Sequence, residues 1–293
     1  MRNSCPPEDL AIHDGYTIVE LMIGLVIGLL VGTVAITFMI SSSRTLATQS
    51  SEDIIQENAR FALEILASSM RLAGSNSSSN PQTQTLSQGI FRGKICDGND
   101  CNVNNNALTV GEAGVSRITT NTDSAAFEYI ATSGKACNGS DISVESQIVS
   151  VFYVADEDGD GVTSLYCEPY QAFLDFVTQS FVNHTSLGSV PLIDGIEMLQ
   201  LQYGVDTDSS GTIDRYMSYD NLVSTPALFD EVKAVRLGLI LSNNQEEQSA
   251  SKRTELVKAR TYTVLDGTLT ANDAMLRQAV STTVFLPNST SNL

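Results

Sequence analysis

The 293-residue chain has no tryptophan and only two histidines, His13 and His184. Histidine is the side chain most often used as a general base near neutral pH. Nothing beside His184 resembles an oriented Ser-His-Asp arrangement, and the sequence has no glycine-rich phosphate loop or zinc-protease motif. The sequence therefore predicts that the protein is not an enzyme.

Positive charge is also scarce, with 16 Lys and Arg against 34 Asp and Glu and a formal net charge of −18. A surface this acidic repels phosphate backbones, so we expect no direct binding of nucleic acid. The acidity is typical of a soluble domain in the cell envelope or outside the cell.

The five cysteines follow no zinc-ligand spacing. Cys5 stands alone near the start, and four cysteines lie in the body of the chain: Cys96, Cys101, Cys137 and Cys167. An even number favours two disulfides formed in an oxidising compartment, although buried free thiols are the alternative. Of the three possible pairings, we favour Cys96–Cys101 with Cys137–Cys167.

Proline and glycine are absent from residues 41–73, and the preceding residues 16–40 are almost wholly apolar. A helix over residues 16–40 would span about 37 Å, enough for a bilayer core of about 30 Å. Apolar residues recur at helical spacing from residue 41 until Gly74 supplies a stop. We expect one helix of roughly 85 Å, membrane-spanning over residues 16–40 and amphipathic over residues 41–74.

Glu20 is the one charged residue of the apolar segment. A carboxylate inside a membrane helix is costly and usually has a partner. If Tyr16 became the N-terminus, Glu20 would lie one helical turn from a free amine and could pair with the amine of a neighbouring chain. The alternative is that Glu20 reaches the lipid headgroups from its place near the segment end.

Three glycines repeat every fourth residue along one face of this segment: Gly24, Gly28 and Gly32. Small residues at this spacing let apolar helices approach closely. A chance cluster in a glycine-tolerant membrane helix is the alternative.

The stretch from Gly15 to Met22, GYTIVELM, resembles the processing motif of type IV prepilins and type II secretion pseudopilins. The following SSSRTLATQSSEDIIQENARFALEILASSMRLAG resembles PilW-type minor pilins, as do IEMLQLQYGVDTDSSGTIDRY and the terminal VSTTVFLPN. The resemblance is dense over the first 74 residues and returns in patches at 147–168, 194–242 and 275–288.

The resemblance implies a leader peptide, residues 1–15, that a prepilin peptidase removes between Gly15 and Tyr16 before methylating the new amine. It assigns Glu20 to pairing with a neighbour's N-terminus during assembly. It further implies partners among other minor and major pilins and an inner-membrane assembly platform. The chain would cross the inner membrane once, with its globular domain in the periplasm, and then reach the pilus and the cell surface.

Residues 75–293 form the β-rich remainder, with strands expected at 147–155, 162–167, 198–205 and 232–241. Asn-, Asp-, Gly- and Ser-rich loops separate these runs. The expected fold is α+β and pilin-like, with the amphipathic half of the helix packed on an antiparallel sheet.

Two Asp-rich loops have the oxygen spacing of a calcium loop. Asp156, Asp158 and Asp160 form the first, and residues 206–214 repeat it loosely. Neither loop has glutamate at the twelfth position, where Cys167 and Met217 stand, and Asp and Gly also suit tight turns. We expect turns and no cofactor, with calcium at the first loop as the alternative.

Together these features predict a minor pilin that takes part in starting or capping a type IV pilus and supports adhesion, twitching motility or DNA uptake. A minor pseudopilin of a type II secretion system is one alternative. A surface adhesin that binds a ligand or calcium is another.

Overall fold

A computed structural model describes residues 17–75, 122–131, 134–143, 146–157, 159, 161–175, 180–243, 259–273 and 275–288. The chain divides into two compact units, residues 1–50 and 51–293. One helix, α1 (Ile18–Leu72), supplies the described part of the first unit and continues into the second. The predicted long helix is therefore confirmed.

The described part of the second unit contains eleven strands and two short helical segments. The strands before the short helices are β1 (Ala125–Ile130), β2 (Gln147–Ala155), β3 (Ser164–Asp175), β4 (Ser180–Ser186), β5 (Val190–Asp194), β6 (Ile196–Val205) and β7 (Arg215–Met217). The remaining elements are α2 (Tyr219–Val223), η3 (Pro226–Glu231), β8 (Val232–Ser242), β9 (Arg260–Val264), β10 (Gly267–Ala271) and β11 (Arg277–Phe285). Each of the four expected strands falls on an observed one: β2, β3, β6 and β8.

The described strands form two larger antiparallel sheets and a separate hairpin. One sheet has the order β1-β2-β3-β4, with β5 also paired to β3, and the other has the order β11-β8-β6-β7. The hairpin is β9–β10. The α+β, pilin-like layout with antiparallel sheets is confirmed, although the strands are divided between two sheets where the sequence suggested one.

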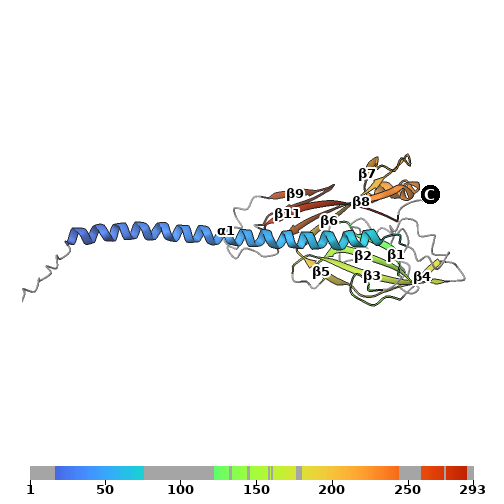
Figure 1. The fold of residues 1–293 in the computed structure, drawn as a ribbon, viewed down its shortest axis with the longest axis horizontal. Helices are drawn as coiled ribbons and strands as arrows, with labels where there is room; N and C mark the ends of the chain where they lie inside the picture. The colour runs from blue at the N-terminus through green and yellow to red at the C-terminus, as the bar shows by residue number, and fades with distance from the viewer. Residues whose placement is uncertain are drawn as a thin grey trace, which may run out of the picture. The chain divides into compact units, whose positions relative to one another are not determined.

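The C-terminal half of α1 packs in the hydrophobic core that both sheets share (Figure 1). Its buried face consists of Ile55, Ala59, Ala62, Leu66, Ala67 and Met70. Apart from Ala67, which is adjacent to Leu66, these residues recur at intervals of three and four, so they lie on one stripe of the helix. In the same core, Phe127 and Phe152 come from the five-stranded sheet, and Leu199 and Leu237 come from the four-stranded sheet.

The end of α1 is held by backbone and side-chain hydrogen bonds. Gly74 has φ +72, and its N–H donates to the carbonyl oxygen of Glu128 over 2.8 Å. The Asn288 amide donates to the carbonyl oxygens of Arg71 and Ala73 over 3.2 and 2.9 Å. These contacts satisfy groups that a helix end otherwise leaves unpaired, and they confirm Gly74 as the predicted stop.

The chain passes from one sheet to the other at Gly195, between β5 and β6. Gly195 has φ +81, and its N–H and C=O bond to Thr163 and Ser242. A Cβ atom here would collide with the Ser242 carbonyl oxygen, so glycine is required on two grounds.

The β9–β10 hairpin packs on the face of the four-stranded sheet that does not meet α1. Met198 of β6, Ile240 of β8 and Val264 of β9 form a small cluster there. The sheet is therefore apolar on both faces over part of its area.

Candidate functional site

The N-terminal half of α1 is the most unusual surface in the described chain. Its large apolar side chains between Ile18 and Met39 each expose more than half of their surface. By length and composition α1 is able to cross a membrane, and none of its most apolar stretch is buried. Exposed apolar area of this extent is unfavourable in water, so this segment needs lipid or other apolar helices around it.

Thr17 and Glu20 form a reciprocal cap at the start of α1. The Glu20 carboxylate accepts hydrogen bonds from the Thr17 N–H and hydroxyl, each over 3.3 Å. The Glu20 N–H donates to the Thr17 hydroxyl oxygen over 3.2 Å. This arrangement is a capping box, in which the first and fourth residues satisfy each other's backbone donors. Glu20 therefore has a partner within its own chain before any neighbour is present.

Sequence reasoning singled out Glu20 but missed Thr17. The signal was available, because Thr followed three residues later by Glu, just before an apolar run, is the capping-box pattern. Gly15 and Tyr16, the predicted processing residues, lie outside the described residues.

The three glycines of α1 face open space. A Cβ atom added at Gly24, Gly28 or Gly32 would have no neighbour within 4 Å outside the helix itself. The absence of side chains there is therefore not required by packing within the described chain. Close packing against another helix stays a prediction.

A disulfide joins Cys137 and Cys167, the pairing that we favoured, across 30 residues of sequence. Cys167 lies in β3 and is fully buried, and Cys137 packs against the same core from the segment before β2. The disulfide fixes this segment to the five-stranded sheet. Cys96 and Cys101 lie outside the described residues.

The first Asp-rich loop is described only in part, because Asp158 and Asp160 lie outside the described residues. The Asp156 carboxylate accepts hydrogen bonds from the N–H groups of Gly159 and Gly161, over 2.9 and 3.1 Å. Cys167, at the twelfth position, is tied up in the disulfide and offers no oxygen ligand. Calcium binding in this loop stays an untested alternative to a tight turn.

The second loop brings three carboxylates together, with oxygen atoms of Asp206, Asp208 and Asp214 within 4.8 Å of one another. Asp206 is buried and accepts hydrogen bonds from the N–H groups of Ser210 and Gly211. Hydrogen bonds from Ser210 lower the pKa of Asp208. These contacts organise a tight turn between β6 and β7.

Asp123 is the described carboxyl group whose pKa is raised most clearly. Burial raises its pKa to about 7, against a hydrogen bond from the Leu201 N–H that lowers it, and Asp266 and Asp220 raise it further. The Asp123 carboxylate accepts that N–H over 2.8 Å, next to β6. Because its pKa differs from the ordinary value of 3.8, the carboxyl group of Asp123 makes folding stability depend on pH.

The fold and the exposed helix define the class: a pilin-like protein with an apolar N-terminal helix and an antiparallel β-rich domain. Residues 151–288 match the model of the family described as Type IV Pilus-assembly protein W, PilW. The matched region runs from β2 to just beyond β11, and the match confirms the resemblance to PilW-type proteins drawn from the sequence. Comparison with curated proteins and with solved structures found no match.

The family match supports a protein related to type IV pilus assembly. Proteins of that family are structural and assembly components of the pilus. The apolar N-terminal helix is suited to a single-pass membrane anchor.

Proposed function

We propose that the protein is a minor pilin. In this proposal a prepilin peptidase cuts between Gly15 and Tyr16 and methylates the new amine. The apolar half of α1 first anchors the chain in the inner membrane and then packs beside other minor and major pilins at the start or tip of a type IV pilus.

The exposed half of α1 is the observation that carries the proposal. Burying apolar surface contributes roughly 25 cal/mol per Å², so a stretch this long is strongly driven into lipid or against like helices. Gly24, Gly28 and Gly32 leave one stripe of the helix without side chains, where such a neighbour could approach closely. The same helix is seated in the core of the second unit through its other half, which ties the β-rich domain to the filament.

Glu20 gives this packing a preferred position. A carboxylate among apolar helices is best satisfied by a positive group, and an N-terminal amine at Tyr16 of a neighbouring chain would be available at the same depth. The Cys137–Cys167 disulfide supports placing the second unit in an oxidising compartment such as the periplasm.

Substitution of Glu20 tests the assembly role. We expect Glu20→Ala to be cleaved and membrane-bound but several-fold depleted from filaments sheared off the cell surface, measured by quantitative immunoblot. Glu52→Ala is the matched control, because it removes an exposed carboxylate from the same helix outside the apolar stretch. Normal incorporation of Glu20→Ala would contradict the pairing role.

The same fractionation separates the minor pilin from a secretion pseudopilin. A minor pilin appears with the sheared filaments. Wild-type protein that stays entirely with the cells while pili are sheared away would favour the pseudopilin instead.

A further inference from the structure

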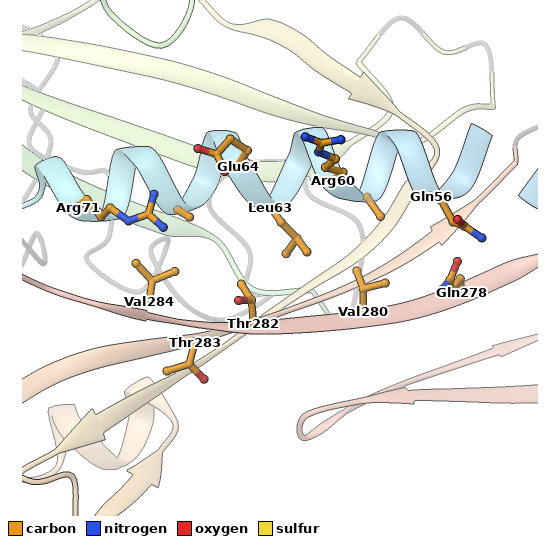
Figure 2. A pocket seen from close by; sticks show the side chains of 12 residues that line it. Gln56, Arg60, Leu63, Glu64, Arg71, Gln278, Val280, Thr282, Thr283 and Val284 are labelled. Carbon is orange, nitrogen blue, oxygen red and sulfur yellow. The ribbon is translucent and has the colours of Figure 1, made fainter. Parts of the chain in front are cut away.

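A groove runs between α1 and the edge strand β11 within the second unit. It has a volume of about 410 Å³, and its lining residues are Gln56, Ala59, Arg60, Leu63, Glu64, Ala67 and Arg71 of α1 with Gln278, Val280, Thr282, Thr283 and Val284 of β11. Figure 2 shows Leu63 pointing from the helix toward β11, while Val280, Thr282 and Val284 point back toward the helix. The groove therefore follows the strand along most of its length.

One edge of β11 is free among the described residues. β11 pairs with β8 and ends the sheet order, and no described strand bonds to its other side. The Leu286 N–H donates to the Lys233 carbonyl oxygen, and the Asn243 N–H donates to the Leu276 carbonyl oxygen. These bonds fix the alternation, because in an antiparallel ladder every second residue points its N–H and C=O away from the partner strand.

The outward-pointing residues are those with odd numbers. Leu276 and Leu286 bond toward β8, so the even-numbered positions between them do the same. The backbone groups of Ala279, Ser281 and Thr283 therefore face the free edge, and all three residues are exposed.

The free edge of β11 lacks the usual features that prevent pairing with another strand. Natural edge strands are commonly short, bulged, or protected by charged residues or proline. β7, the opposite edge of the sheet, has only three residues. From Gln278 to Phe285, β11 has no charged residue and no proline, and its register with β8 has no shift. Arg277 is held inward by Glu197 and Asp273 and does not protect the edge.

The helix side of the groove carries positive charge in a strongly acidic chain. Arg60 and Arg71 are exposed, and their guanidinium groups have no hydrogen bond or ion pair within the described part of the chain. Glu64 is the one carboxylate in the lining. Two guanidinium groups against one carboxylate make the groove locally positive, whereas the whole chain has a net charge of −18.

We propose that β11 accepts an additional β-strand from a partner protein. The partner's extended segment lies in the groove, hydrogen-bonds to the backbone of Ala279, Ser281 and Thr283, and sets carboxylates against Arg60 and Arg71. Addition of a strand to a free sheet edge is an established mode of peptide recognition, in which the backbone supplies affinity and side chains supply selectivity. The proposal concerns the second unit alone and does not depend on filament assembly.

The distance between Arg60 and Arg71 predicts the spacing of the acidic side chains in the partner segment. Arg71 lies eleven positions after Arg60 in the helix, a rise of about 16 Å. A strand covers this distance in about five residues, and residues on one face are an even number apart. The partner segment therefore carries acidic side chains about four or six residues apart.

A second copy of this chain fits the groove poorly. The side chains of β11 that face the helix are Gln278, Val280, Thr282 and Val284, none of which is acidic. Edge-to-edge pairing of two β11 strands would leave all the arginines without carboxylates, between two chains that each carry a net charge of −18. The charges therefore favour a different, acidic partner.

A synthetic peptide of sequence TVEVTVEVT, with both glutamates on one face, is the probe for this site. Fluorescence anisotropy measures its binding to the purified full-length chain in detergent micelles at low salt. We expect it to bind at least about tenfold more tightly than the same peptide with lysine in place of glutamate, since a charge-assisted pair contributes about that much. On binding, the amides of Ala279, Ser281 and Thr283 become protected from hydrogen exchange.

Two sets of variants separate the contribution of backbone hydrogen bonds to peptide binding from that of the arginine charges. Ser281→Pro removes an outward N–H and leaves the β8 pairing intact, so it weakens peptide binding about tenfold, whereas Ser281→Ala does not. Arg60→Glu with Arg71→Glu reverses the preference toward the lysine peptide. An unchanged melting temperature shows that these variants are folded.

Three results would overturn the proposal. The first is equal binding of the glutamate and lysine peptides. The second is protection of the Ala279, Ser281 and Thr283 amides in the free protein, which would mean that the chain covers its own edge. The third is a dimer in sedimentation that Ser281→Pro dissociates, which would make a second copy the occupant.

Discussion

Two carboxyl groups in this protein, those of Asp123 and Glu20, lie in environments less polar than bulk water. Asp123 is partly buried beside β6, and burial raises its pKa to about 7. Glu20 lies in an apolar segment but is satisfied by Thr17. The sequence identifies the second group through its apolar surroundings, whereas the burial of Asp123 follows from strand pairing that is distant in sequence.

Asp123 makes stability depend on pH. Its carboxyl group binds a proton more tightly in the folded chain than in the unfolded chain, where its pKa is near the ordinary 3.8. The stabilisation is therefore fully present below about pH 4 and is lost as the pH rises to about 7, with an upper bound of about 4 kcal/mol. We expect Asp123→Asn to remove this decline, measured by urea unfolding between pH 4 and 8.

The asparagine at this position keeps an oxygen that can accept the Leu201 N–H, so the fold should survive the change. Asp220→Asn is the control, because Asp220 is exposed and should leave most of the pH dependence in place. Equal pH profiles for the wild type and Asp123→Asn would show that the group ionises without cost.

The Cys137–Cys167 disulfide is a second feature at this scale. It closes a loop of 30 residues, for which restriction of the unfolded chain predicts about 3–4 kcal/mol of stabilisation. The double variant Cys137→Ala with Cys167→Ala should lose this amount in urea unfolding. Because Cys167 is buried, the control is the wild type under reducing conditions, which loses the bond but keeps the sulfur atoms. A loss in the variant without a loss on reduction would assign the effect to packing.

Among the elements, α1 has two halves with opposite requirements. The half that packs between the sheets buries Leu66 completely, whereas Leu46 remains 63% exposed. Helical periodicity placed both residues on an apolar face, but it could not say where the sheets end along the helix. Phe61 is also apolar and lies in the half that packs between the sheets, but it is 53% exposed, while the small Ala59 is buried.

A matched pair of substitutions measures this difference. Leu66→Ala should lower the free energy of unfolding by about 2–5 kcal/mol, because it leaves a cavity in a closed core. Leu46→Ala removes the same atoms from an exposed position and should change it by less than about 0.5 kcal/mol. Thermal unfolding of the full chain in detergent, followed by circular dichroism, makes the comparison. Similar losses in both variants would contradict the division of α1 into an exposed N-terminal half and a half that is packed in the core.

The strands show where sequence patterns succeed. The run 147–155 is rich in β-branched and aromatic residues and coincides with β2. β11 was not predicted, because its Ser, Thr and Ala residues alternate weakly in polarity and its exposed edge imposes no apolar pattern. β1, with the sequence AAFEYI, was also missed, since its alanines become buried only through pairing with β2.

At the scale of the whole molecule, the division between units falls inside a helix and not in a linker. The sequence predicted both the length of α1 and the β-rich remainder, because periodicity and composition are local properties. It did not predict that the strands form two sheets with α1 packed in their common core, since that depends on contacts between distant segments. The free edge of β11 belongs to the same class of property.

The second unit should fold without the first. Residues 51–293 retain every buried residue of α1, from Ile55 to Met70, and none of the described residues 17–50 is buried. We expect this fragment to be soluble without detergent and to unfold cooperatively within a few degrees of the full chain. An aggregated or uncooperative fragment would show that residues before Ser51 stabilise the β-rich domain.

The cap at the start of α1 means that Thr17 and the amine of a neighbouring chain would compete for the Glu20 carboxylate. Within one chain it holds the first helical turn through Thr17, so any interaction with a neighbour's amine is an exchange of partners. The net driving force is then the difference between the two bonded states, smaller than the attraction of two bare charges. In the proposed filament, such an exchange would lower the cost of Glu20 in lipid for a lone subunit and would leave docking reversible until the helices pack side by side.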